Sequence, residues 1–137
     1  MATHLVDKSA WVRLADSGVD PRWARLLGSG GLAVTGIAMI EILVGSRTAA
    51  EFNRDRVDLQ AIPRVAVTER LVDRAIEVQG LMVPVGTHRA PSPADLILAA
   101  CAEMTGLTVL HYDKDFDLIA AVTGQPVEWI APPGSIP

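Results

Sequence analysis

Two long apolar stretches, Leu32–Val44 and Leu96–Leu110, limit most strongly what this chain can fold into. A membrane-spanning helix needs roughly 18 apolar residues, and both stretches are either too short or interrupted by a carboxylate, Glu41 or Glu103. The N-terminus has no basic region followed by a long apolar one, and Asp7 comes too early for a signal peptide. We therefore expect no membrane span, and we expect these stretches to be buried in a globular fold.

The length of the chain indicates one domain, covering residues 1–137. Half of the residues are apolar, which favours a covered surface, such as an interface, in addition to a core. The only cysteine is Cys101, which excludes an internal disulfide and makes the cytoplasm the expected compartment.

Segments typical of strands and of helices alternate along the chain. We predict strands at His4–Val6, Leu32–Val34, Val65–Val67, Thr108–Tyr112 and Val127–Ile130. We predict helices at Ser9–Ala15, Pro21–Leu27, Gly36–Gly45, Arg47–Ala61, Thr68–Gly80, Ser92–Thr105 and Asp115–Val122. This alternation favours an α/β sandwich around a mainly parallel sheet.

Four carboxylates stand where a solvated acid is not expected. Glu41 lies in a helix that is apolar all round, where an ionised side chain is costly unless a partner or a metal compensates it. An ion pair with an arginine, or a position at the helix edge, would also explain it. Asp7 follows the first predicted strand, at the end where ligands collect in open α/β sheets. It would equally serve as the cap of the helix that begins near Ser9.

The other two carboxylates also have strong structural interpretations. Ser92 and Asp95 form a capping-box pattern, yet the helix that follows them is deeply apolar. Capping and metal binding are compatible for one carboxylate, because it has two oxygens. Asp113 ends the fourth predicted strand and is followed by Asp115 and Asp117. The alternative interpretation is an acidic turn with Asp115 as the N-cap of the last helix, and we expect at least one of these three acids to have only that role.

Taken together, two strand ends and two apolar helices each carry one carboxylate, and a parallel sheet can bring all four to one edge. All-oxygen ligands suit hard cations such as Mg²⁺ and Mn²⁺, whereas the scattered His4, His88 and His111 offer no zinc site. Carboxylates around such a cation point to phosphoryl chemistry. The pattern predicts a catalytic, metal-binding group of Asp7, Glu41, Asp95 and Asp113.

The net charge of −4 does not exclude a nucleic-acid substrate. If these four acids neutralise bound cations, the remaining 12 acids balance the 12 bases. Ten of the bases are arginine, which grips phosphate oxygens in a bidentate fork. Charge therefore neither establishes nor excludes RNA.

An ordered set of motifs resembles a known family. It comprises Leu5-Val6-Asp7-Lys8-Ser9-Ala10, then Thr35 six residues before Glu41, then Pro93-Ala94-Asp95-Leu96-Ile97-Leu98-Ala99-Ala100, then Tyr112-Asp113-Lys114-Asp115-Phe116-Asp117. Over essentially the whole chain, the set and its spacing are similar to the PIN-domain ribonucleases, and most similar to the VapC-type toxins of bacterial toxin–antitoxin pairs.

The resemblance implies a three-layer α/β/α sandwich, Mg²⁺- or Mn²⁺-dependent cleavage of RNA, a homodimer, and a small antitoxin that blocks the site. It implies these site residues, the first two as principal metal ligands: Asp7, Asp95, Glu41, Asp113 and Asp115. Thr35 matches the family's hydroxyl residue near the first carboxylate and is an auxiliary site residue. The chain departs from the family's pattern at His111, where many members carry Thr or Ser.

Two other classes of protein also gather acids and Mg²⁺ at strand ends. A non-catalytic phospho-acceptor regulatory domain needs an Asp and a later Lys at strand ends, and this chain shows no convincing pair. A phosphatase with an Asp nucleophile usually carries a second Asp where this chain has Ser9. Arg89 is more simply a solvated loop residue than a contact to an RNA phosphate or to the antitoxin. Trp11, Trp23 and Trp129 are more simply core or interface residues than platforms for bases.

Overall fold

The computed structural model describes residues 1–137 and contains one five-stranded sheet. The strands are β1 (His4–Val6), β2 (Leu32–Thr35), β3 (Arg64–Val65), β4 (Thr108–His111) and β5 (Val127–Trp129), in the order β3-β2-β1-β4-β5. Every neighbouring pair is parallel. The predicted parallel α/β architecture is confirmed, with β1 at the centre of the sheet.

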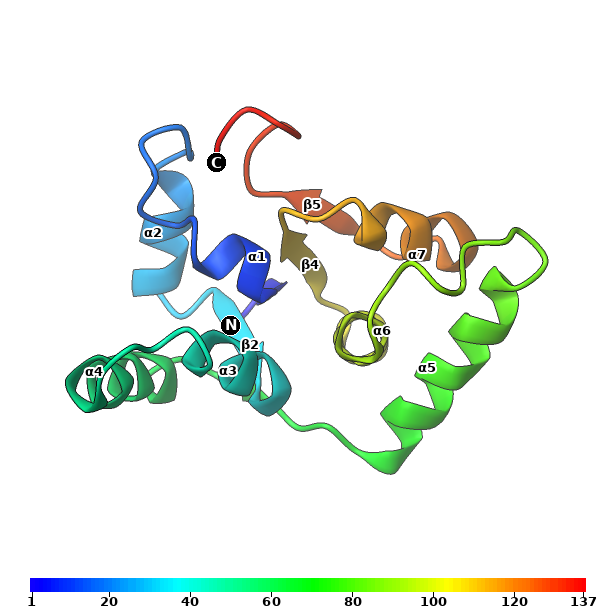
Figure 1. Cartoon of the computed structure of the whole chain (residues 1–137), viewed down its shortest axis with the longest axis horizontal. Coiled ribbons are helices and arrows are strands. Elements are labelled where there is room, and N and C mark those ends of the chain that lie inside the picture. The colour runs from blue at the N-terminus through cyan, green and yellow to red at the C-terminus, as the bar shows by residue number, and fades with distance from the viewer.

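Seven helices connect the strands. They are α1 (Lys8–Trp11), α2 (Arg22–Gly28), α3 (Gly36–Leu43), α4 (Ala49–Gln60), α5 (Glu69–Met82), α6 (Pro93–Thr105) and α7 (Asp115–Thr123). Figure 1 shows α2 and α6 on opposite sides of the strands, with α5 and α7 packed beside α6. This arrangement is the expected three-layer sandwich. No helix is long and apolar enough to cross a membrane.

Most elements lie within two residues of their predicted bounds, and the differences in two of them have a clear cause. The predicted helix Ser9–Ala15 is helical only as far as Trp11. Beyond it, the backbone N–H groups of Arg13 and Leu14 bond to carbonyls three residues back instead of four, so the segment continues as turns. The predicted strand at Val65–Val67 is an edge strand that ends at Val65, because its partner β2 ends at Thr35, opposite that residue.

Helix α6 is fixed firmly in the fold at the predicted residues. At its start, Ser92 and Asp95 each accept a hydrogen bond from the backbone N–H of the other, at 3.1 Å in both directions. At its end, Gly106 takes the left-handed conformation, with φ of 72°. Between these caps, buried side chains such as Leu98 and Cys101 join the core against β1 and β4. Burial of one such leucine is worth about 1.5 to 3 kcal/mol, so α6 is a rigid carrier for Asp95.

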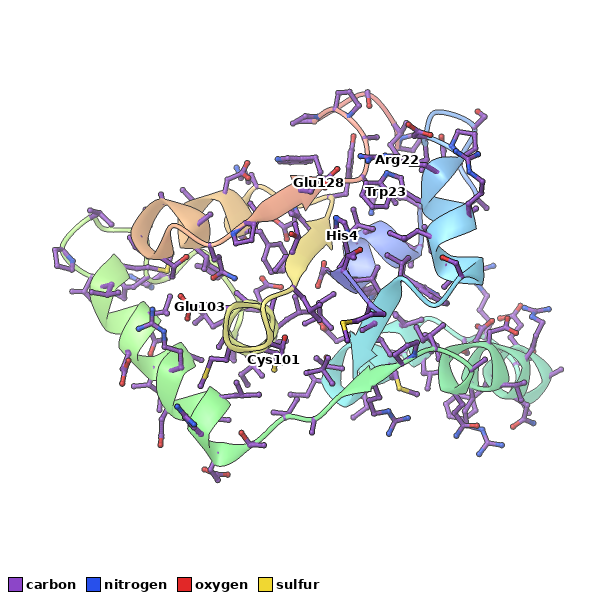
Figure 2. All side chains as sticks on the ribbon, turned by 180° about the vertical axis from the view of Figure 1, so that it is seen from behind. His4, Arg22, Trp23, Cys101, Glu103 and Glu128 are labelled. Carbon is purple, nitrogen blue, oxygen red and sulfur yellow. The ribbon has the colours of Figure 1, made fainter.

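A polar cluster fastens α2 to the sheet (Figure 2). The ring Nε2 of His4 on β1 lies 3.0 Å from Glu128 Oε1 on β5. Arg22 donates to the other oxygen of Glu128, and its guanidinium lies 4.2 Å from the ring centre of the buried Trp23. These contacts hold α2 against β1 and β5.

Candidate active site

The carboxyl ends of the central strands carry two of the predicted acids. Asp7 follows β1 directly and is only 5 % exposed, and its backbone N–H donates to the carbonyl of Leu110 on β4 at 2.9 Å. Asp113 lies two residues after the end of β4. Because β1 and β4 are parallel neighbours, these two carboxylates reach the same edge of the sheet.

Two helices bring the other predicted acids to this edge. Helix α3 begins directly after β2 and carries Glu41, and α6 presents Asp95 in its first turn. Asp7, Glu41, Asp95 and Asp113 all line one cavity of about 370 Å³, together with Lys8, Ser9, Val12, Arg13 and Ser92. Asp115 does not line this cavity but lies beside it. One carboxylate oxygen from each of Asp95, Asp113 and Asp115 falls within 4.8 Å of the other two.

Three of these carboxylates use one oxygen to cap backbone N–H groups. Asp7 Oδ2 accepts from the Ser9 backbone at 3.0 Å and from the Ser9 hydroxyl at 2.5 Å. Asp95 Oδ2 accepts from the Ser92 backbone at 3.1 Å, and Asp113 Oδ1 accepts from the Asp115 backbone at 2.9 Å. In each case no hydrogen bond reaches the second oxygen. The capping interpretation is therefore right for Asp7 and Asp95, and all three residues keep one oxygen for a ligand. The interpretation of Asp115 as the N-cap of the last helix is wrong, because Asp115 is the first residue of α7 and Lys114 occupies the cap position without a side-chain hydrogen bond.

Glu41 has no such partner. It makes no ion pair and no side-chain hydrogen bond, so the interpretation as an ion pair with an arginine is wrong. Burial raises the pKa of Glu41, the charges of Asp7 and Asp95 raise it further, and Lys8 opposes them. A half-buried carboxylate that faces other carboxylates and has no ion-pair partner is a group that a cation would stabilise.

Asp95 and Asp115 experience the same electrostatic crowding. Burial raises the pKa of Asp95, against the hydrogen bonds from Ser92 and in the same direction as the charges of Asp7 and Asp113. Burial, followed by the charge of Asp113, raises the pKa of Asp115. The cavity therefore carries more negative charge than its own bases balance.

Thr35 lies outside the cavity and contacts the start of the helix that carries Glu41. Its side chain is buried, does not line the cavity, and accepts a hydrogen bond from the Ala38 backbone at 3.1 Å. Thr35 is thus the N-cap of α3, the helix that carries Glu41. Its predicted auxiliary role stays a prediction, and its visible contact is with the helix start.

Two residues, Ser9 and His111, support the site by hydrogen bonds that the local sequence does not indicate. The Ser9 hydroxyl donates to Asp7 and accepts from the Tyr112 backbone at 2.9 Å, which links the ends of β1 and β4. His111 is fully buried, and its Nδ1 accepts from the Asp113 backbone at 3.1 Å. The only available signal was the position of each, two residues from a predicted ligand.

The remaining polar and aromatic residues of interest lie elsewhere. Asp117 is exposed and accepts from the indole N–H of Trp129 at 3.0 Å. Trp23 is 2 % exposed and belongs to the core, as expected. Arg89 is exposed and forms no ion pair, which fits a solvated loop residue.

The donor set fits a hard cation. Every candidate ligand atom is a carboxylate oxygen, with no histidine or cysteine lining the cavity, and Mg²⁺ and Mn²⁺ prefer such ligands. Uncapped oxygens, the unpartnered Glu41 and the raised pKa values of Glu41 and Asp95 indicate a site in which bound positive charge relieves repulsion.

Known proteins match the chain over most of its length. The family model of the PIN domain matches residues 4–122. Ribonuclease VapC2 of Mycobacterium tuberculosis is 45 % identical over 126 residues, which cover 90 % of this chain and 89 % of that protein. Ribonuclease VapC51 of the same species is 40 % identical over 133 residues, covering 97 % and 96 % of the two chains.

Solved structures agree on the fold at lower sequence identity. The VapBC2 complex of Rickettsia felis, bound to a promoter DNA fragment, contains a chain that matches with a TM-score of 0.73 at 13 % identity, covering 93 % of this chain and 98 % of that one. The Mycobacterium tuberculosis toxin VapC20 matches with a TM-score of 0.61 at 20 % identity, covering 84 % and 93 %. The chain belongs to the PIN-domain family and, within it, to the VapC-type proteins.

Proposed function

We propose that the chain is a ribonuclease that hydrolyses RNA phosphodiester bonds with Mg²⁺ or Mn²⁺ held by carboxylates, and that it is the toxin of a toxin–antitoxin pair. The observation that carries the proposal is the meeting of four carboxylates, from β1, α3, α6 and the end of β4, on one cavity. Relatives at 36 to 45 % identity over nearly their whole length are named ribonucleases.

Asp7, Asp95 and Asp113 would hold the cation through the oxygens that their caps leave free, with Asp115 beside them. Ser9 and Ser92 fix the orientation of two of these carboxylates by hydrogen bonds. A bound divalent cation supplies Lewis-acid stabilisation of the phosphate and an acidified water.

Glu41 is suited to a different part of the reaction. Its carboxylate accepts no hydrogen bond and makes no ion pair, so it is free to accept a proton. We assign to it the acceptance of a proton from the attacking water. This role fits a carboxylate that lines the cavity from α3, a different helix from the one that carries Asp95.

The proposal includes two protein partners. Among the solved structures that share the fold, one from Klebsiella pneumoniae is a toxin–antitoxin complex, with a TM-score of 0.67 at 18 % identity. We infer a homodimer that binds a small antitoxin, which would insert a basic residue among the acids. Exposed apolar side chains, such as Ile40, Val44 and Val85, fit surfaces that partners cover. The single, buried thiol of Cys101 fits the reducing cytoplasm.

The test is RNA cleavage by purified protein freed of any antitoxin. Cleavage should require Mg²⁺ or Mn²⁺ and stop in excess EDTA, and restored cation should restore it. Undiminished cleavage in EDTA would refute the metal-dependent mechanism. Sequencing of the RNA ends formed on expression would then identify the substrate.

A further inference from the structure

Arg13 is the one arginine that lines the acidic cavity. Arg13 lies in the turns that follow α1, and its side chain is half-buried. Four carboxylates line the same cavity, yet none has an oxygen within 4.0 Å of a nitrogen of Arg13. An arginine placed beside acids usually pairs with one of them, so this separation needs an explanation.

Main-chain oxygens hold the side chain in place. Its Nη1 donates to the carbonyl of Ser9 at 2.7 Å, and its Nε donates to the main-chain oxygen of Pro137 at 2.8 Å. Its guanidinium carbon lies 4.6 Å from the ring centre of Tyr112. The Tyr112 hydroxyl in turn bonds to the backbone of Ile136, donating to its carbonyl at 3.0 Å and accepting from its N–H at 3.2 Å.

This arrangement leaves free donors on a guanidinium that is held in place. A guanidinium has five N–H groups, and two of those of Arg13 are occupied. Because three N–H groups keep no protein acceptor and none of the four acids that line the cavity pairs with the guanidinium, Arg13 remains able to bind an anion in the cavity. A planar guanidinium matches the oxygens of a phosphate in a bidentate geometry.

We propose that Arg13 is a substrate-binding residue. It binds a phosphate of the RNA backbone that neighbours the phosphate to be cleaved, which lies at the carboxylates. This inference rests on the proposed ribonuclease function. A phosphate diester is the anion that a carboxylate-held cation and a neighbouring arginine bind together. A carboxylate of a protein partner fits less well, because it would enter a cavity that already holds four.

The test compares Arg13→Gln, which removes the charge, with Arg13→Lys, which keeps it without the fork. Arg25→Gln is the matched control, because Arg25 is exposed, forms no ion pair and does not line the cavity. Binding of a labelled single-stranded RNA oligonucleotide is measured in Ca²⁺ over a series of salt concentrations, with the RNA checked for integrity. Initial rates of cleavage in Mg²⁺ give kcat and KM.

Loss of one phosphate contact should weaken RNA binding by Arg13→Gln about tenfold at low salt. It should also reduce the slope of log K against log salt by about 0.7. KM should rise with little change in kcat, because a contact with a flanking phosphate is the same in ground and transition states. Arg13→Lys should keep the slope but bind RNA more weakly than the wild type, and Arg25→Gln should match the wild type.

RNA affinity and slope of Arg13→Gln equal to those of Arg25→Gln would overturn the inference, and so would an effect confined to the antitoxin complex. If Arg13→Gln does not fold, Arg13→Lys decides: weaker RNA binding at an unchanged melting temperature supports the inference, and unchanged binding overturns it. If the wild type cleaves RNA and the Arg13 variants bind and cleave it equally well, the inference fails and the proposed function stands. Binding that depends on Arg13 without any cleavage leaves the inference intact and removes the proposed function.

Discussion

Replacement of Asp95 by asparagine separates the two roles of this residue, which are to cap the start of α6 and to bind a cation. Asparagine offers a side-chain oxygen to the Ser92 backbone N–H, so the start of α6 should survive at a cost of about 1 kcal/mol or less. The change also removes a charge that the metal-free cavity holds at a cost, since burial raises the pKa of Asp95. We therefore expect metal-free Asp95→Asn to melt at or above the wild-type temperature.

The pH dependence follows from the sign of this shift. A carboxyl with a raised pKa in the folded state destabilises the fold once it ionises. The wild type should lose stability as the pH rises from the pKa of the unfolded state to that of the folded state, and Asp95→Asn should lose less over the same interval.

With a cation bound, the order of the two melting temperatures should reverse, so that the wild type melts above Asp95→Asn. At a cation concentration of 100 times Kd, binding stabilises the fold by about 2.7 kcal/mol. At roughly 3 to 5 °C per kcal/mol for a chain of this size, the wild type should melt about 10 °C higher in Mn²⁺ than in EDTA. Asp95→Asn should lose most of this increase, and its RNA cleavage should fall by at least about 100-fold.

The assay measures melting temperature and RNA cleavage on the same metal-free and metal-loaded samples. Asp73→Asn, at an exposed position on α5 with no ion pair, is the control for loss of one acid. Near-normal cleavage and a wild-type response to Mn²⁺ in Asp95→Asn would leave only the capping role and remove the centre of the proposed site.

Three further substitutions test the surroundings of the site. Glu41→Gln should raise the melting temperature of the metal-free protein at neutral pH, because it removes an unpartnered carboxylate with a raised pKa, while cleavage falls; a lower melting temperature contradicts this. His111→Asn should keep an acceptor near the Asp113 backbone N–H and retain more cleavage per folded molecule than His111→Leu; equal cleavage by both would show that the hydrogen bond does not position Asp113. Thr35→Val should cost about 1 to 2 kcal/mol in unfolding free energy through loss of the α3 cap, and a disproportionate loss of cleavage would instead give Thr35 a direct role.

Elements with local start signals could be located from the sequence almost to the residue. Ser92 marks the start of α6 by side-chain chemistry that acts within four residues, and His4–Val6 is a strand as predicted. The first helix was predicted too long, because its apolar residues reflect packing of the turns beyond Trp11 instead of helical periodicity. Local patterns identify where an element begins more reliably than where tertiary packing ends it.

The four acids could be predicted because each conflicts with its apolar surroundings, and because parallel strands share one carboxyl edge. Arg13 and Ser9 could not, since their contacts with Pro137 and Tyr112 join residues more than 100 positions apart. Nothing in the local sequence distinguishes Arg13 from the other nine arginines. Its contribution arises only when the end of the chain packs beside α1.

The capping bonds explain how such an acidic site can exist in the folded protein. Asp7, Asp95 and Asp113 each receive a backbone N–H on one oxygen, so folding itself orients them before any cation binds. This preorganisation has a cost, since burial first and the charges of neighbouring acids second raise the pKa values of Asp95 and Glu41. A cation would recover that cost on binding, because the repulsion it relieves is already present in the metal-free fold. Among the four acids that line the cavity, Glu41 alone accepts no hydrogen bond, so it keeps the freedom of orientation that a proton-accepting group needs and a fixed ligand does not.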